Sequence, residues 1–263
     1  MQISPLPTEI LKSINNYRIG SVPFLNAAPL TFGVENFIEL EPPNRLAKRL
    51  EGGKLDAALL SVTELLNLPD YELGTEYGIC SAGPVLSVFL AHTEELEAMK
   101  FIDIDPATRT SIQLLRFVLR KMGLDPVLRP MKLSYPEAHL SKNILLIGNP
   151  AIDFKFSNHS HQYLDLGEMW TKLTGLPFVY AGWLMRKNLR ESELEYSLNF
   201  IAQRGLKNLT YIHHYNREYT KDFRKKYVGR AIYYSLGDKE REGLQFFLND
   251  LESQKSKSQQ SFK

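Results

Sequence analysis

Short apolar runs alternate with stretches of helical periodicity along the first 66 residues, and this alternation limits the fold more than any other feature. Apolar runs of strand length occupy residues 17–22, 37–40 and 55–60. A helical stretch at 44–51 separates the last two runs. Continuous apolar runs are typical of strands buried on both faces of a parallel sheet. The strand–helix–strand order predicts right-handed crossovers, so we expect an α/β fold.

The first strand passes into a helix through the segment RIGSVPFLNAAPL, residues 18–30. In an open α/β sheet, ligands bind where a strand ends at such a turn. Asn26 lies in this turn and offers two donors and one acceptor, but an amide cannot act as a general base. We therefore expect Asn26 to hold a carboxylate or hydroxyl. The alternative is that Asn26 only caps a helix at 26–35, with Pro29 in its first turn.

Composition excludes several classes of function. The chain has 263 residues, of which 43% are hydrophobic, enough for one large or two modest domains. Lys and Arg number 32 against 30 Asp and Glu, so no strong field for nucleic acid or membrane is expected. The single cysteine, Cys80, allows no internal disulfide and has the apolar setting of a small buried hydrophobe.

No apolar run reaches transmembrane length, and no basic region followed by an apolar one opens the chain. We therefore expect a cytoplasmic enzyme or binding protein. The sequence gives no oligomeric state.

Two long apolar runs, 86–91 and 178–185, lie between two α/β patterns. We expect the chain to leave a first lobe along one run and to return along the other, with a ligand cleft between the lobes. The expected boundaries are 17–91 plus 187–252 for the first lobe, 92–186 for the second, 1–16 for an N-terminal arm and 253–263 for a polar, disordered tail.

Several polar turns follow strands and precede helices, so each offers N–H groups at the positive end of a helix. Ser61 has the position of an N-cap, with Glu64 at the capping-box position. Serine and threonine at one such turn are usually structural, but several turns at one sheet edge favour a small-anion site. The candidate residues in the other turns are Gly83, Ser87, Thr110, Ser111 and Asn149.

No histidine lies in these turns, and no motif for a nucleotide, a serine nucleophile or a zinc protease is present. His159 and His161 have the spacing of a metal pair, but no carboxylate or thiolate adjoins them. We expect a structural or solvated role for this pair. We therefore expect neither a metal nor a cofactor.

Six segments taken in order resemble the chorismate dehydratase family of the futalosine route to menaquinone: VPFLNAAPL, LDAALLS, CSAGPVLSV, RTSIQLL, LIGNPA and DLGEMWTKLTGLPFVYAGW. The resemblance covers residues 18–186. It implies a two-lobed fold of the type II periplasmic-binding-protein class, with two crossing strands, used as a cytoplasmic enzyme. One residue departs from the pattern, because Asn149 stands where the family usually has aspartate.

The resemblance implies a carbon–oxygen lyase that removes water from chorismate to give 3-[(1-carboxyvinyl)oxy]benzoate. Aromatisation supplies the driving force, so neutral donors that orient a dicarboxylate substrate suffice. Asn26 and Ser87 match the family's catalytic positions. The residues that we expect to bind substrate are Ser61, Gly83, Thr110, Ser111 and Asn149. Two alternatives remain: a non-catalytic carboxylate-binding protein of the same fold, and the 1,4-dihydroxy-6-naphthoate synthase of the same pathway, which would need a base such as histidine.

Overall fold

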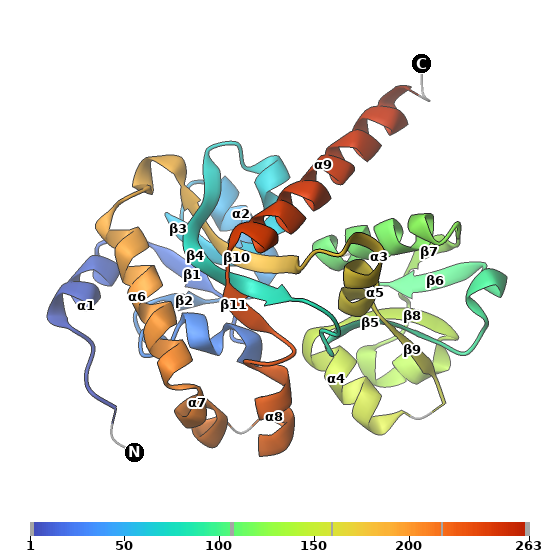
Figure 1. Ribbon diagram of the computed structural model, residues 1–263, viewed down its shortest axis with the longest axis horizontal. Helices are drawn as coiled ribbons and strands as arrows, with labels where there is room; N and C mark the ends of the chain where they lie inside the picture. The colour runs from blue at the N-terminus through green and yellow to red at the C-terminus, as the bar shows by residue number, and fades with distance from the viewer. Residues whose placement is uncertain (1–2, 106–107, 159, 217, 261–263) are drawn as a thin grey trace. The chain divides into compact units, whose positions relative to one another are not determined.

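The computed structural model (Figure 1) describes residues 3–105, 108–158, 160–216 and 218–260. The chain divides into two compact units, each with its own sheet. Unit 1 comprises Met1–Cys80 and Val179–Asn249, and unit 2 comprises Ser81–Phe178 and Asp250–Lys263. In the described part of the chain, no helix has the length and apolar character needed to cross a membrane.

The first unit contains most of the helices. In chain order its elements are α1 (Thr8–Asn15), β1 (Ile19–Ser21), η1 (Leu25–Leu30), β2 (Glu39–Leu40), α2 (Pro43–Glu51), β3 (Ala57–Ser61), η2 (Val62–Asn67), β4 (Tyr71–Ser81), β10 (Phe178–Arg186), η5 (Lys187–Leu189), α6 (Glu193–Lys207), α7 (Leu209–Tyr215), α8 (Lys221–Tyr227), β11 (Tyr233–Ser235) and the first part of α9 (Asp238–Gln260). The part of α9 from Asp250 onward belongs to unit 2. The strand order in the sheet of unit 1 is β11-β4-β10-β3-β1-β2. Strand β1 runs parallel to β2 and β3, whereas β10 is antiparallel to β3.

Helix α2 covers one face of this sheet. Its residues Leu46 and Leu50 are fully buried and join Ala58 and Leu184 in one core cluster. A Cβ at Gly20 would meet the side chains of Leu46 and Leu55, so a larger residue there would require these leucines to shift. This packing fixes the end of β1, where the first polar turn begins.

The second unit is a smaller α/β layer. Its elements are β5 (Val88–His92), η3 (Leu96–Ala98), β6 (Phe101–Ile104), α3 (Arg109–Lys121), β7 (Val127–Pro130), η4 (Tyr135–Leu140), β8 (Asn143–Ile147), α4 (Gly148–Ser157), β9 (Gln162–Asp165) and α5 (Leu166–Thr174). The strand order is β7-β6-β8-β5-β9, with β6 parallel to β7 and β8. Helices α3 and α5 pack together through Phe117 and Trp170, whose ring centroids lie 4.8 Å apart. Helix α4 packs through Phe154 on a cluster that includes Phe89 and Ile144.

Three features of the fold differ from the sequence prediction. Both sheets are mixed rather than parallel, because β10 and β5 pair antiparallel with their neighbours. The segment that we expected as a helix at 26–35 is the 3-10 helix Leu25–Leu30, which contains Pro29. The polar tail after Ser253 continues the helix α9 as far as Gln260.

Strand β5 lies wholly inside unit 2, although we expected the run at 86–91 to lead out of the first lobe. Its two neighbours, β8 and β9, both belong to unit 2, and Phe89 lies opposite Leu146 and Asp165. The chain instead leaves unit 1 at Cys80 and returns to it at Val179. The periodicity alone could not separate these cases, because both place an apolar strand at the same residues.

Candidate active site

In unit 1, two of the predicted residues follow neighbouring parallel strands. Gly20 of β1 lies opposite Ala58 of β3, so the carboxyl ends of both strands meet at one edge of the sheet. Asn26 comes after the first strand and Ser61 ends the second. The topology therefore brings these two residues to one edge of the first sheet. The other candidate residues lie in unit 2, which has its own sheet, so the expectation of one shared sheet edge is wrong.

Asn26 is held by its main chain. Its carbonyl accepts a 3.0 Å hydrogen bond from the hydroxyl of Tyr234, a fully buried residue of β11. Its side-chain Oδ1 is buried and has no hydrogen-bond partner among the described residues. An unsatisfied buried acceptor is costly, and such groups in native proteins often mark a binding site. The Asn26 Oδ1 therefore caps no N–H of the described chain, and η1 begins after Phe24 rather than at Asn26.

Ser61 is an N-cap, as its position in the sequence predicts. Its Oγ accepts from the Thr63 N–H at 3.3 Å and lies 2.8 Å from the Thr63 hydroxyl. Ser21, at the end of β1, is fully buried, and its Oγ has no partner in the described part of the chain. Ser21 belongs to the segment 18–30, in which the sequence predicts a binding turn, but it was not among the candidate site residues.

In unit 2, the loop from Ser81 to Ser87 is held by α5 and by its N-cap residue, Asp165. The Gly83 N–H donates to the hydroxyl of Thr171 at 2.9 Å. The carboxylate of Asp165 accepts from the N–H groups of Val85 and Leu86 at 3.0 and 2.9 Å. The loop that contains Gly83 and Ser87 is therefore ordered by long-range hydrogen bonds.

Ser87 lies just before β5, whereas the apolar run at 86–91 predicted that it lies on the strand. Strand β5 begins at Val88, because Leu86 adopts a φ of 68° that interrupts the extended backbone. Ser87 is buried, with 3% of its surface exposed, and its carbonyl accepts from the Gly148 N–H at 2.7 Å. This bond joins the loop of Ser87 to the turn that precedes Asn149.

Asn149 and the Thr-Ser pair lie in the first turns of helices. Helix α4 begins at Gly148, where φ is 61°, and Asn149 is its second residue. Thr110 and Ser111 are the second and third residues of α3 and are buried. Arg109, which precedes them, is exposed.

These turns share one edge of the second sheet. Val88 at the start of β5 lies opposite Ile147 at the end of β8. Strand β6 runs parallel to β8 and leads toward the start of α3 at the same edge. The topology of unit 2 therefore gathers Ser87, Asn149 and the Thr110–Ser111 turn, together with the loop of Gly83.

The carboxyl of Asp165 holds the loop of Gly83 and Ser87 through its hydrogen bonds. Burial raises the pKa of this carboxyl above its ordinary value, and four backbone N–H groups oppose that rise. The Cys80 thiol is fully buried and its pKa is raised by burial, so it is no nucleophile, in agreement with the sequence prediction.

Among the described residues, no cluster of histidine, cysteine and carboxylate side chains could hold a metal ion. His159 lies outside the described residues, and His161 is buried with its Nε2 2.8 Å from the Ser141 carbonyl oxygen.

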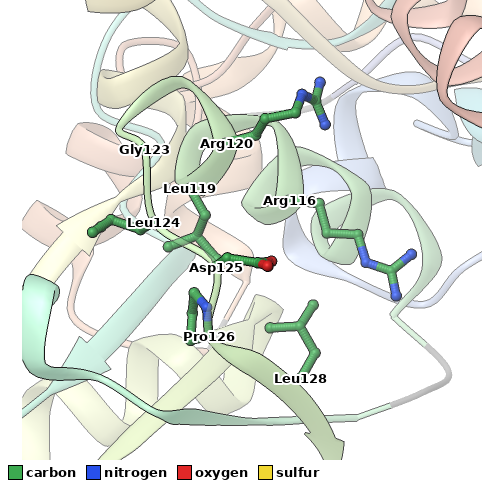
Figure 2. Close-up of a pocket in the computed structure, with 8 residues that line it drawn as sticks. All are labelled: Arg116, Leu119, Arg120, Gly123, Leu124, Asp125, Pro126 and Leu128. Atoms are coloured by element: carbon green, nitrogen blue, oxygen red, sulfur yellow. The ribbon is translucent and has the colours of Figure 1, made fainter.

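A cavity of about 600 Å³ at the far end of α3 contains none of the predicted residues (Figure 2). Its polar groups come from Arg116, Arg120 and Asp125. Arg120 is occupied, because its Nη2 lies 2.6 and 2.7 Å from the two carboxylate oxygens of Asp250. This hollow therefore adds nothing to the site at the opposite end of the helix.

The sequence analysis missed Asp165 and Thr171. The pattern Asp-Leu-Gly-Glu at 165–168 has the form of a capping box and could have indicated an N-cap. The bonds that Asp165 accepts from Val85 and Leu86, about eighty residues earlier in the chain, cannot be recognised from the sequence around Asp165.

The fold places the chain with periplasmic-binding-protein-like structures. The alignment with a protein from Archaeoglobus fulgidus covers 91% of this chain and 97% of that protein, with a TM-score of 0.66 and 16% identity. A second similar structure is a Candida albicans protein described as having the generic periplasmic-binding-protein fold. The alignment covers 92% of this chain and 90% of that protein, with a TM-score of 0.60 and 12% identity. The alignment with the periplasmic aliphatic sulphonate-binding protein of Escherichia coli covers 91% of this chain and 87% of that protein, with a TM-score of 0.57 and 13% identity.

The sequence gives the family. The model of the menaquinone biosynthesis family matches residues 17–253, and this chain belongs to that family. A relative from Thermus thermophilus named chorismate dehydratase is 26% identical over 195 residues, which are 65% of this chain and 70% of the relative.

Proposed function

We propose that this chain is a chorismate dehydratase, a carbon–oxygen lyase that converts chorismate to 3-[(1-carboxyvinyl)oxy]benzoate. The observation that carries the proposal is the match to a relative of that name within the menaquinone biosynthesis family. The placement of Ser87, Asn149 and Thr110–Ser111 at one sheet edge supports it, because these are neutral hydrogen-bond donors suited to a carboxylate.

The reaction needs little acid or base from the protein. The C–O bond of the ring hydroxyl breaks, a neighbouring ring carbon loses its proton, and the electron pair of that C–H bond completes the aromatic ring. The hydroxyl and the proton leave together as one water. We propose that a carboxylate of the substrate itself takes the proton and passes it to the departing hydroxyl, which leaves as water, since the sequence of the candidate turns contains no histidine.

Asn26 and Ser87 then have orienting roles. A side-chain amide and a hydroxyl can hold the departing oxygen and the carboxylates in a reactive geometry without changing their own charge. The unsatisfied Oδ1 of Asn26 supports such a role, because a hydroxyl donor of the substrate would satisfy it. An Asn26→Asp variant that gained activity would contradict orientation by a neutral amide.

Ser87 gives the sharpest test of the site. A hydrogen bond that strengthens only in the transition state contributes about a hundredfold to kcat. Ser87→Ala should therefore fold, bind chorismate with near-normal affinity and turn over about a hundredfold more slowly. A variant with wild-type kcat and a lowered Tm would make Ser87 a structural serine. Ser160→Ala is a matched control, because Ser160 is an exposed serine of unit 2 that lies outside the candidate turns.

A non-catalytic carboxylate-binding protein is the second candidate, because solved structures of this fold include sulphonate-binding proteins. The two candidates differ in turnover. Chorismate that binds but is recovered unchanged would favour the binding protein.

A further inference from the structure

The carboxylate of Asp165 accepts four backbone hydrogen bonds that fall into two groups. Its Oδ1 accepts from Gly167 and Glu168 at 3.0 and 3.1 Å, which caps α5, and also from Val85 at 3.0 Å. Its Oδ2 accepts from Leu86 alone, at 2.9 Å. One oxygen therefore serves mainly the helix and the other serves only the loop.

Leu86 has an uncommon backbone. Its φ of 68° lies in the left-handed region, which is unfavourable for a residue with a branched, bulky side chain. Only three described non-glycine residues have a positive φ, and Leu86 is the one that adjoins a candidate site residue. Strained backbone persists where the surrounding structure holds it, and it is concentrated at functional sites.

The strained residue sets the direction of its neighbour. Ser87 follows Leu86 directly, and its own carbonyl is fixed by the Gly148 N–H at 2.7 Å. The hydrogen bond holds the carbonyl end of Ser87. The direction of its Cα–Cβ bond then depends on the orientation of the peptide that joins Ser87 to Leu86. A relaxed, extended Leu86 would turn Ser87 toward the alternation of an ordinary strand.

We propose that Asp165 is a positioning residue: its Oδ2 holds Leu86 in the left-handed conformation and so sets the orientation of Ser87. The catalytic consequence rests on the proposed function, in which Ser87 contacts substrate. The conformational claim stands on the hydrogen bonds alone. A cap that served only α5 would have no need of a bond to Leu86.

The two oxygens allow the two roles of Asp165 to be separated by one substitution. In Asp165→Asn, the amide oxygen keeps the three bonds of Oδ1, because the reversed amide would set its donors against three N–H groups. The new Nδ2 then faces the Leu86 N–H, donor against donor. The helix cap survives while the bond to the strained residue is lost.

The experiment compares Asp165→Asn, Leu86→Gly and the double variant in chorismate turnover. Glycine adopts a positive φ without strain, so Leu86→Gly removes the need for the bond. We expect Asp165→Asn to lose at least tenfold in kcat with little change in KM, and the same substitution to cost less than threefold in the Leu86→Gly background. Equal losses in both backgrounds would overturn the proposal. Ser192→Ala is the control, since Ser192 caps α6 in unit 1, where its Oγ accepts from the Glu195 N–H.

Amide hydrogen exchange tests the proposal without activity. In the wild type, the Leu86 amide should exchange at least tenfold more slowly than a free loop amide. In Asp165→Asn, only the exchange of Leu86 should accelerate, while Gly167 and Glu168 stay protected. Free exchange of Leu86 in the wild type would overturn the proposal even if the variant failed to fold. An inactive wild type with a protected Leu86 would instead refute the proposed function and leave the positioning device intact.

Discussion

Helix α6 packs against η1 at a point where only glycine fits. A Cβ on Gly205 would lie 1.9 Å from the carbonyl oxygen of Pro29 and 2.7 Å from its carbonyl carbon. These are backbone atoms, so no side-chain rotation can relieve the contact. Because ordinary contacts begin at 3.4 Å, Gly205→Ala must move η1 away from α6 by about 1.5 Å.

This displacement affects stability and activity in different ways. Replacing glycine with alanine in a helix gains about 1 kcal/mol from propensity, whereas forcing a methyl group into a packed interface costs about 1–3 kcal/mol. Because the clash is with backbone, we take the upper end of that cost and expect a net loss of about 2 kcal/mol. That loss lowers Tm by about 4–8 °C in a protein of this size.

The displacement should also lower kcat/KM strongly, because η1 contains Asn26, a proposed catalytic residue. A misplacement of about 1 Å can reduce turnover about a hundredfold. We therefore expect kcat/KM of Gly205→Ala with chorismate to fall about a hundredfold at a temperature where the variant remains folded.

Calorimetry and initial rates test both parts. Gln203→Ala is the matched control, because Gln203 is an exposed residue of the same helix and changes only propensity. A Gly205→Ala variant with unchanged Tm and unchanged rate would refute the close packing of η1 on α6. A lowered Tm with a normal rate would keep the packing and remove Asn26 from the reaction.

Three further predictions concern other parts of the chain. The double variant Thr110→Ala/Ser111→Ala should raise KM about tenfold more than it lowers kcat if the pair binds ground and transition states alike, and a normal KM would remove the pair from the site. Cys80 should resist a thiol reagent in the native protein and react fully after denaturation, so rapid native labelling would contradict its burial. Burial opposes ionisation of Asp56, but hydrogen bonds from Arg18 outweigh it and hold the pKa of Asp56 below its ordinary value of 3.8. The stability that this pair contributes is therefore present above pH 3.8 and lost as the pH falls through the lowered value, and Asp56→Asn should flatten that part of the Tm–pH curve.

The elements predicted best are those whose signal is local. Strand β3 is an apolar run, and helix α2 has Pro43 at its start and Gly52 directly after its end. Each follows from burial or chain stereochemistry within a few residues. Elements without such a signal were missed, including the exposed edge strand β7 and the short strand β9.

The candidate residues were found by the same local logic, because a polar turn between a strand and a helix can be recognised in sequence. Their support could not be found in this way. Asp165 stabilises a loop about eighty residues earlier, and Tyr234 holds the Asn26 carbonyl from more than two hundred residues later. The positive φ of Leu86 is also invisible in sequence, because leucine is not a residue that indicates a left-handed turn.

Incubation of the purified chain with chorismate, followed by mass spectrometry and ultraviolet absorbance, tests the central claim most directly. We expect chorismate to disappear while an aromatic acid lighter by one water, 3-[(1-carboxyvinyl)oxy]benzoate, accumulates in equal amount, and we expect Ser87→Ala to slow this conversion about a hundredfold. Recovery of unchanged chorismate after prolonged incubation with folded wild-type protein would contradict the proposed activity.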